Sequence, residues 1–293
     1  MKKTLCLVAF LVILFIPSFG QGIPILQEKL EKQTSDFPGE VGIAVVYDRN
    51  VVCVNCDTHF PMFSVVKFHQ ALAICEKLRE GNIPDIIVKK KTLKPDTWSP
   101  MREKYPKGGK FSVNQLLEYT LIESDNNACD ILFNNVASPT QVDNIIHNWG
   151  IKDFGIAWTE AQQHADISRC NDNWTTPFTA VQLLDRFYND YDTDKYSRFV
   201  WETMAKCQTG ANRIPKYIGS QATKIVHKTG TGGITPDSKV MGINDIACII
   251  LPDGRHFELA VFIKNADCTP AECEELIAEI AKICFEEIKN AKQ

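Results

Sequence analysis

The sequence predicts an α+β protein, in which one antiparallel sheet is built from both chain ends, with flanking helices and an inserted all-helical domain. Residues of high β propensity gather near both ends of the chain, and the segment between them, 64–207, has a helical pattern. A chain of 293 residues with 44% hydrophobic residues is long enough to bury such a core. We therefore expect a sheet domain from residues 21–62 and 215–293, a helical domain from 63–214, and a separate leader over 1–20.

Strands are expected where runs of β-branched and apolar residues are bounded by turn residues, at 41–47, 51–55, 224–227, 243–251 and 257–264. Asp48, Arg49 and Asn50 stand between the first two runs, which predicts a hairpin. Pro252 and Gly254 stand between the last two runs and predict a second hairpin. Hairpins at both ends of the chain make the sheet antiparallel.

Helix boundaries follow from capping residues. A serine or threonine followed by Pro, or by Gln three residues later, predicts helix starts at Ser112, Ser138, Thr176 and Thr269. Gly150 indicates the end of one helix, because glycine adopts the left-handed conformation of a helix C-terminus. An amphipathic helix over 25–33 opens the chain, and the helix after Thr269 closes it.

The leader has the pattern of a secretory signal peptide. Lys2 and Lys3 precede an apolar run over 5–16, and small residues over 17–20 come before a cleavage point near Gln21. The apolar run is shorter than the roughly 20 residues of a membrane-spanning helix, and no later segment approaches that length. We therefore expect a periplasmic or secreted protein without a membrane span.

Basic and acidic residues nearly balance in this chain. The 32 Lys and Arg residues against 36 Asp and Glu residues give a net charge of -4 at pH 7. A protein that binds the phosphate backbone of a nucleic acid needs a surplus of basic residues. Nucleic acid is therefore not an expected partner, and we expect a monomer that acts on a small molecule.

The chain has 11 cysteines, which we expect to be mostly free thiols. Five of them lie in apolar helical or strand patterns typical of small buried side chains: Cys75, Cys129, Cys207, Cys248 and Cys284. Cys53 and Cys56 form a lone C-x-x-C with no histidine pair at zinc spacing, so no metal site is expected. If the exported protein has a disulfide, Cys268 and Cys273 are the favoured pair.

Ser64 and Lys67 are the first candidates for catalysis. A separation of three residues places the hydroxyl and the amine on one face of a helix. A serine hydroxyl is a weak nucleophile at neutral pH, and an adjacent amine with a lowered pKa can take its proton. An S-x-x-K motif occurs by chance about once in a chain of this length, so a helix cap and a surface lysine are the simpler alternative.

Two further motifs change that balance. Ser124-Asp125-Asn126 interrupts a helical pattern, and Lys228-Thr229-Gly230 ends a strand. S-x-x-K, S-D-N and K-T-G in this order are shared by penicillin-binding proteins and class A β-lactamases. From about residue 25 to the C-terminus, the sequence resembles a class A serine β-lactamase, whose fold of a sheet domain and a helical domain agrees with the one expected here.

The resemblance implies acyl transfer to Ser64 followed by hydrolysis. The backbone N–H groups of Ser64 and Thr231 would hold the oxyanion of the opened lactam carbonyl. Lys67, or Glu160 through a water molecule, would take the serine proton. Ser124 would pass a proton to the departing lactam nitrogen, while Lys228 keeps the site positive.

Glu160 has the role that separates a hydrolase from its relatives. In the family, a glutamate on an omega-shaped loop activates the water that attacks the acyl-enzyme, and Glu160 stands at the corresponding interval. A D-alanyl-D-alanine peptidase would have no use for this residue and usually carries a membrane anchor. A penicillin-sensing domain would also stop at the acyl-enzyme. These two functions are the alternatives to β-lactam hydrolysis.

Substrate-binding roles are also implied by the resemblance. The residues concerned are Asn126, His164, Arg213, Thr229, Gly230 and Thr231. Asn126 would bond the side-chain amide of a β-lactam, and an arginine placed at Arg213 would help the threonines to bind its carboxylate. Arg213 could equally be an ordinary surface arginine. Neither a metal nor an organic cofactor is required.

Three positions depart from the commonest family pattern. Trp158 replaces an arginine that closes the omega loop, His164 replaces an asparagine that helps to hold the hydrolytic water, and Asp130 replaces another asparagine. A different loop closure is therefore expected. The run that ends at Asn173-Trp174 resembles extended-spectrum and Bacteroides-type cephalosporinases, which predicts hydrolysis of cephalosporins.

Overall fold

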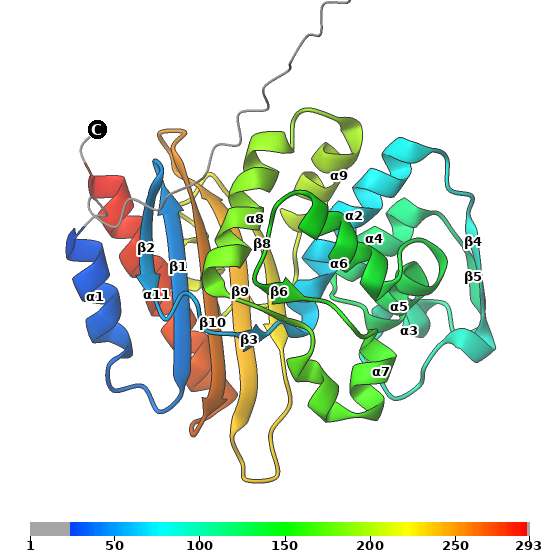
Figure 1. Cartoon of the computed structure of the whole chain (residues 1–293), viewed down its shortest axis with the longest axis horizontal. Coiled ribbons are helices and arrows are strands. Elements are labelled where there is room, and N and C mark those ends of the chain that lie inside the picture. Colours follow the sequence, from blue (N-terminus) through cyan, green and yellow to red (C-terminus); the bar gives the residue numbers. More distant parts are fainter. Residues whose placement is uncertain (1–23, 292–293) are drawn as a thin grey trace, which may run out of the picture.

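A five-stranded antiparallel sheet separates two groups of helices (Figure 1). Its strands follow the order β2-β1-β10-β9-β8, so both chain ends contribute, as the α+β prediction requires. The bounds are β1 (Glu40–Tyr47), β2 (Asn50–Val54), β8 (Lys224–Thr231), β9 (Val240–Ile250) and β10 (His256–Ala266). The structure, a computed structural model, describes residues 24–291, and the expected signal peptide at 1–20 lies outside the described residues.

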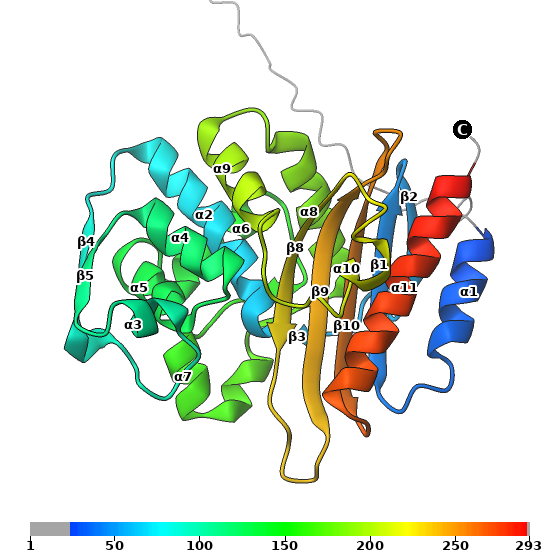
Figure 2. The same cartoon turned by 180° about the vertical axis from the view of Figure 1, so that it is seen from behind.

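One face of the sheet is covered by the two terminal helices, α1 (Pro24–Thr34) and α11 (Pro270–Asn290), which lie side by side (Figure 2). The alternation of side chains along β1 shows how the sheet is buried on both faces. Val41, Ile43 and Val45 pack in the core beneath these helices, whereas Ala44 and Val46 pack in the core on the opposite face. The sheet is therefore the middle layer of the molecule.

The opposite face of the sheet is covered by α8 (Pro177–Asp190), which contacts β1, β9 and β10. This helix belongs to the stretch 63–214, which the sequence assigns to the helical domain, yet it packs directly on the sheet. Beyond it lies α2 (Val66–Glu80), the central helix of the helical region, in which every residue from Val66 to Cys75 is buried.

The remaining elements surround α2 or connect it to the sheet. The helices are α3 (Pro100–Lys104), α4 (Val113–Ile122), α5 (Asn126–Asn135), α6 (Pro139–Asn148), α7 (Glu160–Ala165), α9 (Lys195–Met204) and α10 (Pro215–Ile218). The short strands and 3-10 turns are β3 (Phe60–Pro61), β4 (Ile86–Lys89), β5 (Gly108–Phe111), β6 (Phe154–Gly155), β7 (Trp174–Thr175), η1 (Phe63–Val65), η2 (Lys90–Thr92) and η3 (Ile167–Asn171).

The capping signals in the sequence are confirmed. At all four predicted starts the hydroxyl of the cap accepts a hydrogen bond from a backbone N–H of the first helical turn, at Ser112, Ser138, Thr176 and Thr269. Gly150 follows α6 with φ +84°, as expected at a helix C-terminus. The strands extend further than expected, and β8 runs through Thr231, so the K-T-G motif is part of the strand.

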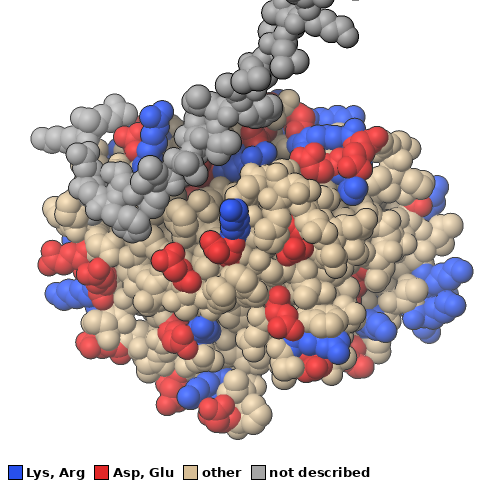
Figure 3. Space-filling model, viewed as in Figure 1, with Lys and Arg blue, Asp and Glu red and all other residues tan. Residues whose placement is uncertain are grey.

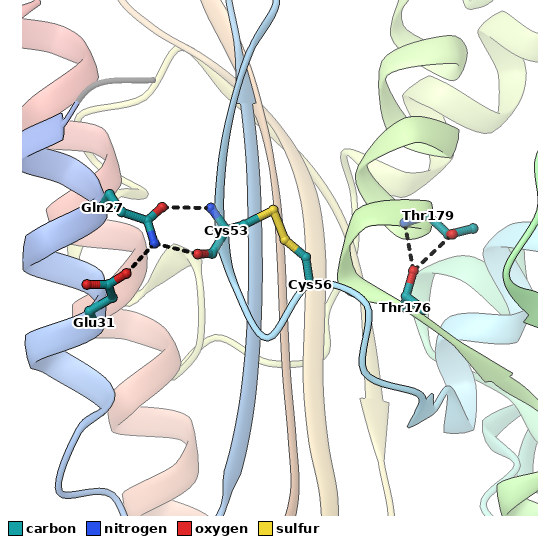
Figure 4. Close-up of a disulfide and its surroundings, with 6 residues drawn as sticks. All are labelled: Gln27, Glu31, Cys53, Cys56, Thr176 and Thr179. Atoms are coloured by element: carbon teal, nitrogen blue, oxygen red, sulfur yellow. Dashed lines mark hydrogen bonds between the residues drawn. A yellow bond between two sulfur atoms is a disulfide. The ribbon is translucent and has the colours of Figure 1, made fainter. Parts of the chain in front are cut away.

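The cysteine predictions need two corrections. The disulfide joins Cys53 to Cys56 (Figure 4), because the chain turns back at Asn55 (φ 48°) directly after β2. The favoured pair was wrong: the sulfurs of Cys268 and Cys273 lie 3.5 Å apart and are not bonded. Cys207 was expected inside an apolar element but lies in the turn after α9 and is partly exposed.

None of the helices between residues 24 and 291 is both long and apolar enough to cross a bilayer. On the face seen in Figure 3, acidic and basic side chains are mixed over most of the surface, and several basic side chains lie together at the right-hand edge. Within the same residues, no cluster of three or more potential metal ligands occurs.

Candidate active site

Ser64 lies in η1, the turn that leads from β3 into α2, and Lys67 lies in the first turn of α2. The Nζ atom of Lys67 is 2.6 Å from the Oγ atom of Ser64. The turn is held from the sheet side, because the ring of Phe63 (φ 46°) packs on Gly232 and Gly242. A Cβ atom at either glycine would lie less than 3 Å from that ring, at 2.4 Å and 2.6 Å.

The ammonium group of Lys67 is fully buried and brings three segments together. Besides Ser64, it donates to the backbone oxygen of Ser124 at 3.1 Å and to Oδ1 of Asn126 at 2.6 Å. Oε1 of Glu160 lies 2.7 Å from the same nitrogen. A buried ammonium with several oxygen partners is well compensated for its loss of water.

The S-D-N motif occupies the break between α4 and α5, as the sequence predicts. Ser124 has φ 57°, a left-handed conformation that is uncommon outside glycine. The buried carboxylate of Asp125 fixes this conformation by accepting hydrogen bonds from Ala128 N (2.8 Å), Met101 N (2.7 Å) and the hydroxyl of Ser99. Asp125 therefore supports the site from behind, while Ser124 and Asn126 face it.

Lys228 approaches Ser124 from β8, the edge strand that faces the helical region. Its Nζ atom donates to Oγ of Ser124 at 2.9 Å and to the backbone oxygen of Thr229 at 2.9 Å. Burial and the nearby charge of Lys67 lower the pKa of Lys228 to about 7. The Ser124 hydroxyl thus lies between two lysines, since Lys67 is 3.5 Å away on its other side.

Glu160 is the first residue of α7, and its backbone is held by a second carboxyl group. Asp130 accepts hydrogen bonds from Glu160 N at 2.8 Å and from Ala161 N at 2.9 Å. Burial and the charge of Glu160 raise the pKa of Asp130 to about 7. Asp130 was noted in the sequence only as a departure from the family pattern, and the structure shows that it anchors the start of α7.

The omega loop, residues 157–173, is closed by an amide rather than an ion pair. The fully buried side chain of Asn173 accepts hydrogen bonds from Ala157 N and Trp158 N, both at 2.9 Å, and donates to Trp158 O at 2.8 Å. The indole of Trp158 donates to Asp172 at 2.8 Å and stacks under the guanidinium of Arg169. This arrangement is the different closure that Trp158 predicts, and sequence reasoning did not find the part played by Asn173.

Arg213 is a buried residue rather than the surface arginine that the sequence left open. Its guanidinium donates to Gly230 O (3.0 Å), Asn244 O (2.9 Å) and the hydroxyl of Thr231 (2.7 Å), and it pairs with Glu274 at 3.1 Å. The guanidinium therefore fixes the backbone at the end of β8 and also binds the side chain of Thr231.

The other substrate-binding candidates divide into two groups. Thr229, Gly230 and Thr231 lie together on β8, and Gly230 leaves room for the turn before Ser64, because a Cβ atom there would lie 2.4 Å from Met62 O. His164 lies exposed in the last turn of α7. No hydrogen bond in the described part of the chain joins it to the other site residues.

These contacts define a class of protein. A serine hydroxyl, a buried lysine and a carboxylate in contact, with a second lysine on an edge strand, are the parts of a serine enzyme that transfers acyl groups through a covalent intermediate.

Comparison with known proteins identifies the family within that class. The sequence model of the β-lactamase enzyme family matches residues 25–288, so the chain belongs to this family. A β-lactamase of Phocaeicola vulgatus is 34% identical over 271 residues, which cover 89% of this chain and 84% of that protein.

Solved structures agree with this assignment. The TLA-1 extended-spectrum β-lactamase superposes with a TM-score of 0.87 at 35% identity, over 92% of this chain and 99% of that chain. A class A β-lactamase from Bacteroides cellulosilyticus gives 0.86 at 32% identity, over 93% and 100% of the two chains. The protein is a β-lactam hydrolase of the class A, serine type.

Proposed function

We propose that this protein opens β-lactam rings in two steps. Ser64 is first acylated, and the acyl-enzyme is then hydrolysed by a water molecule that Glu160 activates. One observation supports the assignment most strongly. The ammonium of Lys67 contacts both the Ser64 hydroxyl, at 2.6 Å, and the Glu160 carboxylate, at 2.7 Å. The nucleophile and the carboxylate therefore share one proton-conducting group.

In acylation, Ser64 Oγ attacks the lactam carbonyl and its proton passes to Lys67, or through a water molecule to Glu160. The carbon–nitrogen bond breaks, and Ser124 delivers a proton to the departing nitrogen. Lys228 supports this transfer, because it contacts the Ser124 hydroxyl at 2.9 Å and burial brings its pKa near neutrality. The backbone N–H groups of Ser64 and Thr231 hold the oxyanion.

In deacylation, Glu160 takes a proton from water, and the resulting hydroxide attacks the ester carbonyl. The ester bond breaks, and Ser64 regains its proton. Substrate is held by Asn126 at its side-chain amide and by Thr229, Gly230 and Thr231 near its carboxylate, with Arg213 fixing the Thr231 hydroxyl at 2.7 Å. His164 contributes from α7 at the mouth of the omega loop.

The substrates include cephalosporins. The support is the similarity to an extended-spectrum enzyme together with the replacements at Trp158 and His164, which alter the loop that carries Glu160. The protein acts as an exported monomer, cut near Gln21. The basic, apolar and small-residue pattern of positions 1–20 supports export, and N-terminal mass analysis of the secreted protein tests it.

Replacement of Glu160 tests the two-step mechanism. Glu160→Gln keeps the size and polarity of the side chain but removes its basicity, so deacylation should slow by about a thousandfold, or about 4 kcal/mol of barrier. A burst followed by stalled turnover is expected, with one drug adduct by intact-mass spectrometry. The adduct should be absent from the double variant Ser64→Ala, Glu160→Gln.

Glu123→Gln is the matched control, because Glu123 adjoins Ser124 in the chain and no ion pair joins it to Lys67 within the described residues. It should turn over normally. Wild-type turnover in Glu160→Gln would remove Glu160 from its role. A long-lived adduct on the wild-type protein would instead identify a peptidase or a penicillin sensor.

A further inference from the structure

Positive charge is concentrated in one short segment of this chain. Residues 85–110 contain eight Lys and Arg residues against three Asp and Glu residues, a net charge of +5 in a chain whose net charge is -4. The segment comprises β4, most of β5 and the chain between them, on the side of the helical region away from the five-stranded sheet (Figure 1, Figure 2). The basic side chains at the right-hand edge of Figure 3 lie where Figure 1 shows this two-stranded ribbon.

The outer face of the ribbon carries an exposed aliphatic side chain beside lysines. The antiparallel register pairs Ile87 with Lys110, and Lys89 with Gly108. Because side chains alternate between the two faces of a strand, Val88 packs in the core, whereas Ile87 and Lys89 point away from it. Ile87 is 71% exposed. Its side chain would be stabilised by any contact that removes it from water.

Further lysines surround Ile87. Lys94 borders the same surface hollow as Ile87, and Lys90 and Lys91 directly follow β4. Lys107 lies in the tight turn that opens β5, opposite the end of β4. We call this surface the lysine edge, which consists of Ile87 and the lysines within residues 89–94 and 107–110.

Most charges of the lysine edge have no acidic partner. Within residues 24–291, its only ion pair joins Lys110 to Asp85, at 3.3 Å. Asp96 and Glu103 are the other acidic residues of the segment, and both are exposed. The lysine edge is therefore a patch of largely uncompensated positive charge, which attracts anionic surfaces.

The backbone beneath the lysine edge is held in place by hydrogen bonds. Lys94 N donates to Oδ1 of Asn127 at 2.7 Å, and Nδ2 of Asn127 donates to Lys94 O at 3.1 Å. The guanidinium of Arg102 donates to Pro95 O at 2.5 Å and to Thr97 O at 3.0 Å. These bonds tie the segment to α5 and α3. The backbone that presents the lysines is thus already ordered before a partner binds, which lowers the entropy cost of binding.

We propose that the lysine edge binds the surface of a bilayer that contains anionic phospholipids. The ammonium groups contact the headgroup phosphates, and Ile87 enters the boundary between headgroups and acyl chains, where its side chain leaves water. Ile87 separates this partner from a soluble polyanion such as a nucleic acid. A chain of phosphates binds the lysines equally well but offers an exposed isoleucine no apolar environment.

The test measures co-sedimentation of the mature protein, cut near Gln21, with lipid vesicles. Residues 1–20 are absent from this form, so their apolar run contributes nothing to lipid binding. The protein should bind vesicles of equal parts phosphatidylglycerol and phosphatidylcholine at least about thirtyfold more tightly than vesicles of phosphatidylcholine alone. High salt should weaken this binding, because it screens the charges. Equal affinity for the two kinds of vesicle, or no binding to either, overturns the proposal.

The triple variant Lys89→Gln, Lys90→Gln, Lys91→Gln tests the lysines themselves. A lysine near an anionic bilayer contributes about fivefold to affinity, so the three substitutions should weaken binding to the anionic vesicles by about a hundredfold. All three side chains are exposed and lie outside the proposed active site. Thermal unfolding and β-lactam turnover in solution should therefore stay as in the wild type.

The matched control is the triple variant Lys32→Gln, Lys282→Gln, Lys289→Gln. These lysines are also exposed, and they lie on α1 and α11, at the opposite end of the molecule (Figure 1). The control removes the same charge from the protein, but screening by salt should keep its effect on vesicle binding below about threefold. Equal losses in the two triple variants would show that only net charge matters, and would overturn the lysine edge as the binding surface.

Ile87→Ser distinguishes a bilayer from a soluble polyanion. The variant should bind the anionic vesicles about tenfold more weakly, because serine gains little from leaving water. Its retention on immobilised heparin, a sulfated polysaccharide, should be unchanged. If Ile87→Ser binds vesicles as the wild type does, the surface is a general polyanion site and the bilayer is the wrong partner. These binding results do not depend on whether the proposed hydrolysis is correct.

Discussion

Oδ1 of Asp130 accepts a hydrogen bond from the backbone N–H of Glu160 at 2.8 Å. The same carboxyl group bonds Ala161 N, so it caps the helix that carries the proposed general base. The position of Glu160 thus depends on a group whose own ionisation is disfavoured by burial and by the Glu160 charge. The two backbone hydrogen bonds favour the ionised form of Asp130, whereas burial and the charge of Glu160 favour its protonated form.

Asp130→Asn should change how stability depends on pH. Because the folded protein holds the Asp130 proton with a pKa of about 7, above the ordinary carboxyl pKa of 3.8, wild-type stability should fall as pH rises from about 4 to about 7. The amide has no such proton, so the variant should lose less stability over this window, by up to about 4 kcal/mol. Urea unfolding at a series of pH values measures the difference. Parallel curves for the two proteins would contradict the prediction.

Asn173→Ala should loosen the omega loop. The variant leaves the partly buried groups Ala157 N, Trp158 N and Trp158 O without their protein partner, at about 1 kcal/mol for each hydrogen bond lost. Because Glu160 follows two residues after Trp158, deacylation should slow more than acylation. Stopped-flow kinetics separate the two steps. Asn171→Ala, at an exposed position of the same loop, is the control and should behave as wild type.

Arg213→Lys should affect both stability and catalysis. The ammonium cannot reproduce the contacts of the guanidinium with Gly230, Asn244 and Thr231, so we expect a loss of about 2 kcal/mol of unfolding free energy. KM should rise, because the Thr231 hydroxyl is no longer fixed. Arg198→Lys, with a side chain 57% exposed, should change neither quantity. A kinetic effect without a loss of stability would show that the buried contacts matter little.

Cephalosporins should be hydrolysed at least as well as penicillins. The prediction follows from the altered omega loop and from the similarity to an extended-spectrum enzyme. Steady-state kinetics with benzylpenicillin and a first-generation cephalosporin provide the measurement. A tenfold advantage in kcat/KM for the penicillin, equivalent to about 1.4 kcal/mol, would contradict it.

The sequence predicts what local chemistry decides. Ser112 and Thr269 start helices because each cap satisfies backbone N–H groups within its own turn. The S-D-N motif breaks a helix for a similarly local reason, since Asp125 caps α5. The three motifs were located by their order along the chain, and the contacts of Lys67 and Lys228 with Ser124 bring them together.

The features that the sequence could not predict depend on contacts between residues that are distant in the sequence. Arg213 gave no sign of burial, because its acceptors lie on β8 and β9. Asn173 closes the omega loop by binding Trp158, 15 residues earlier in the chain, and no local sequence pattern indicates this pairing. The disulfide depends on the turn at Asn55, a conformation that the C-x-x-C spacing alone does not specify.

The hydrogen bonds of Gln27 have a consequence for how copies of this chain meet. β2 is one edge of the sheet, and the Gln27 side chain accepts from Cys53 N at 3.1 Å and donates to Cys53 O at 2.6 Å (Figure 4). The amide imitates the backbone of a further strand, so these two groups of the edge are already paired. An open edge would invite strands of other molecules and lead to aggregation. A single glutamine on α1 thus makes the β2 edge a poorer template for a strand of another molecule.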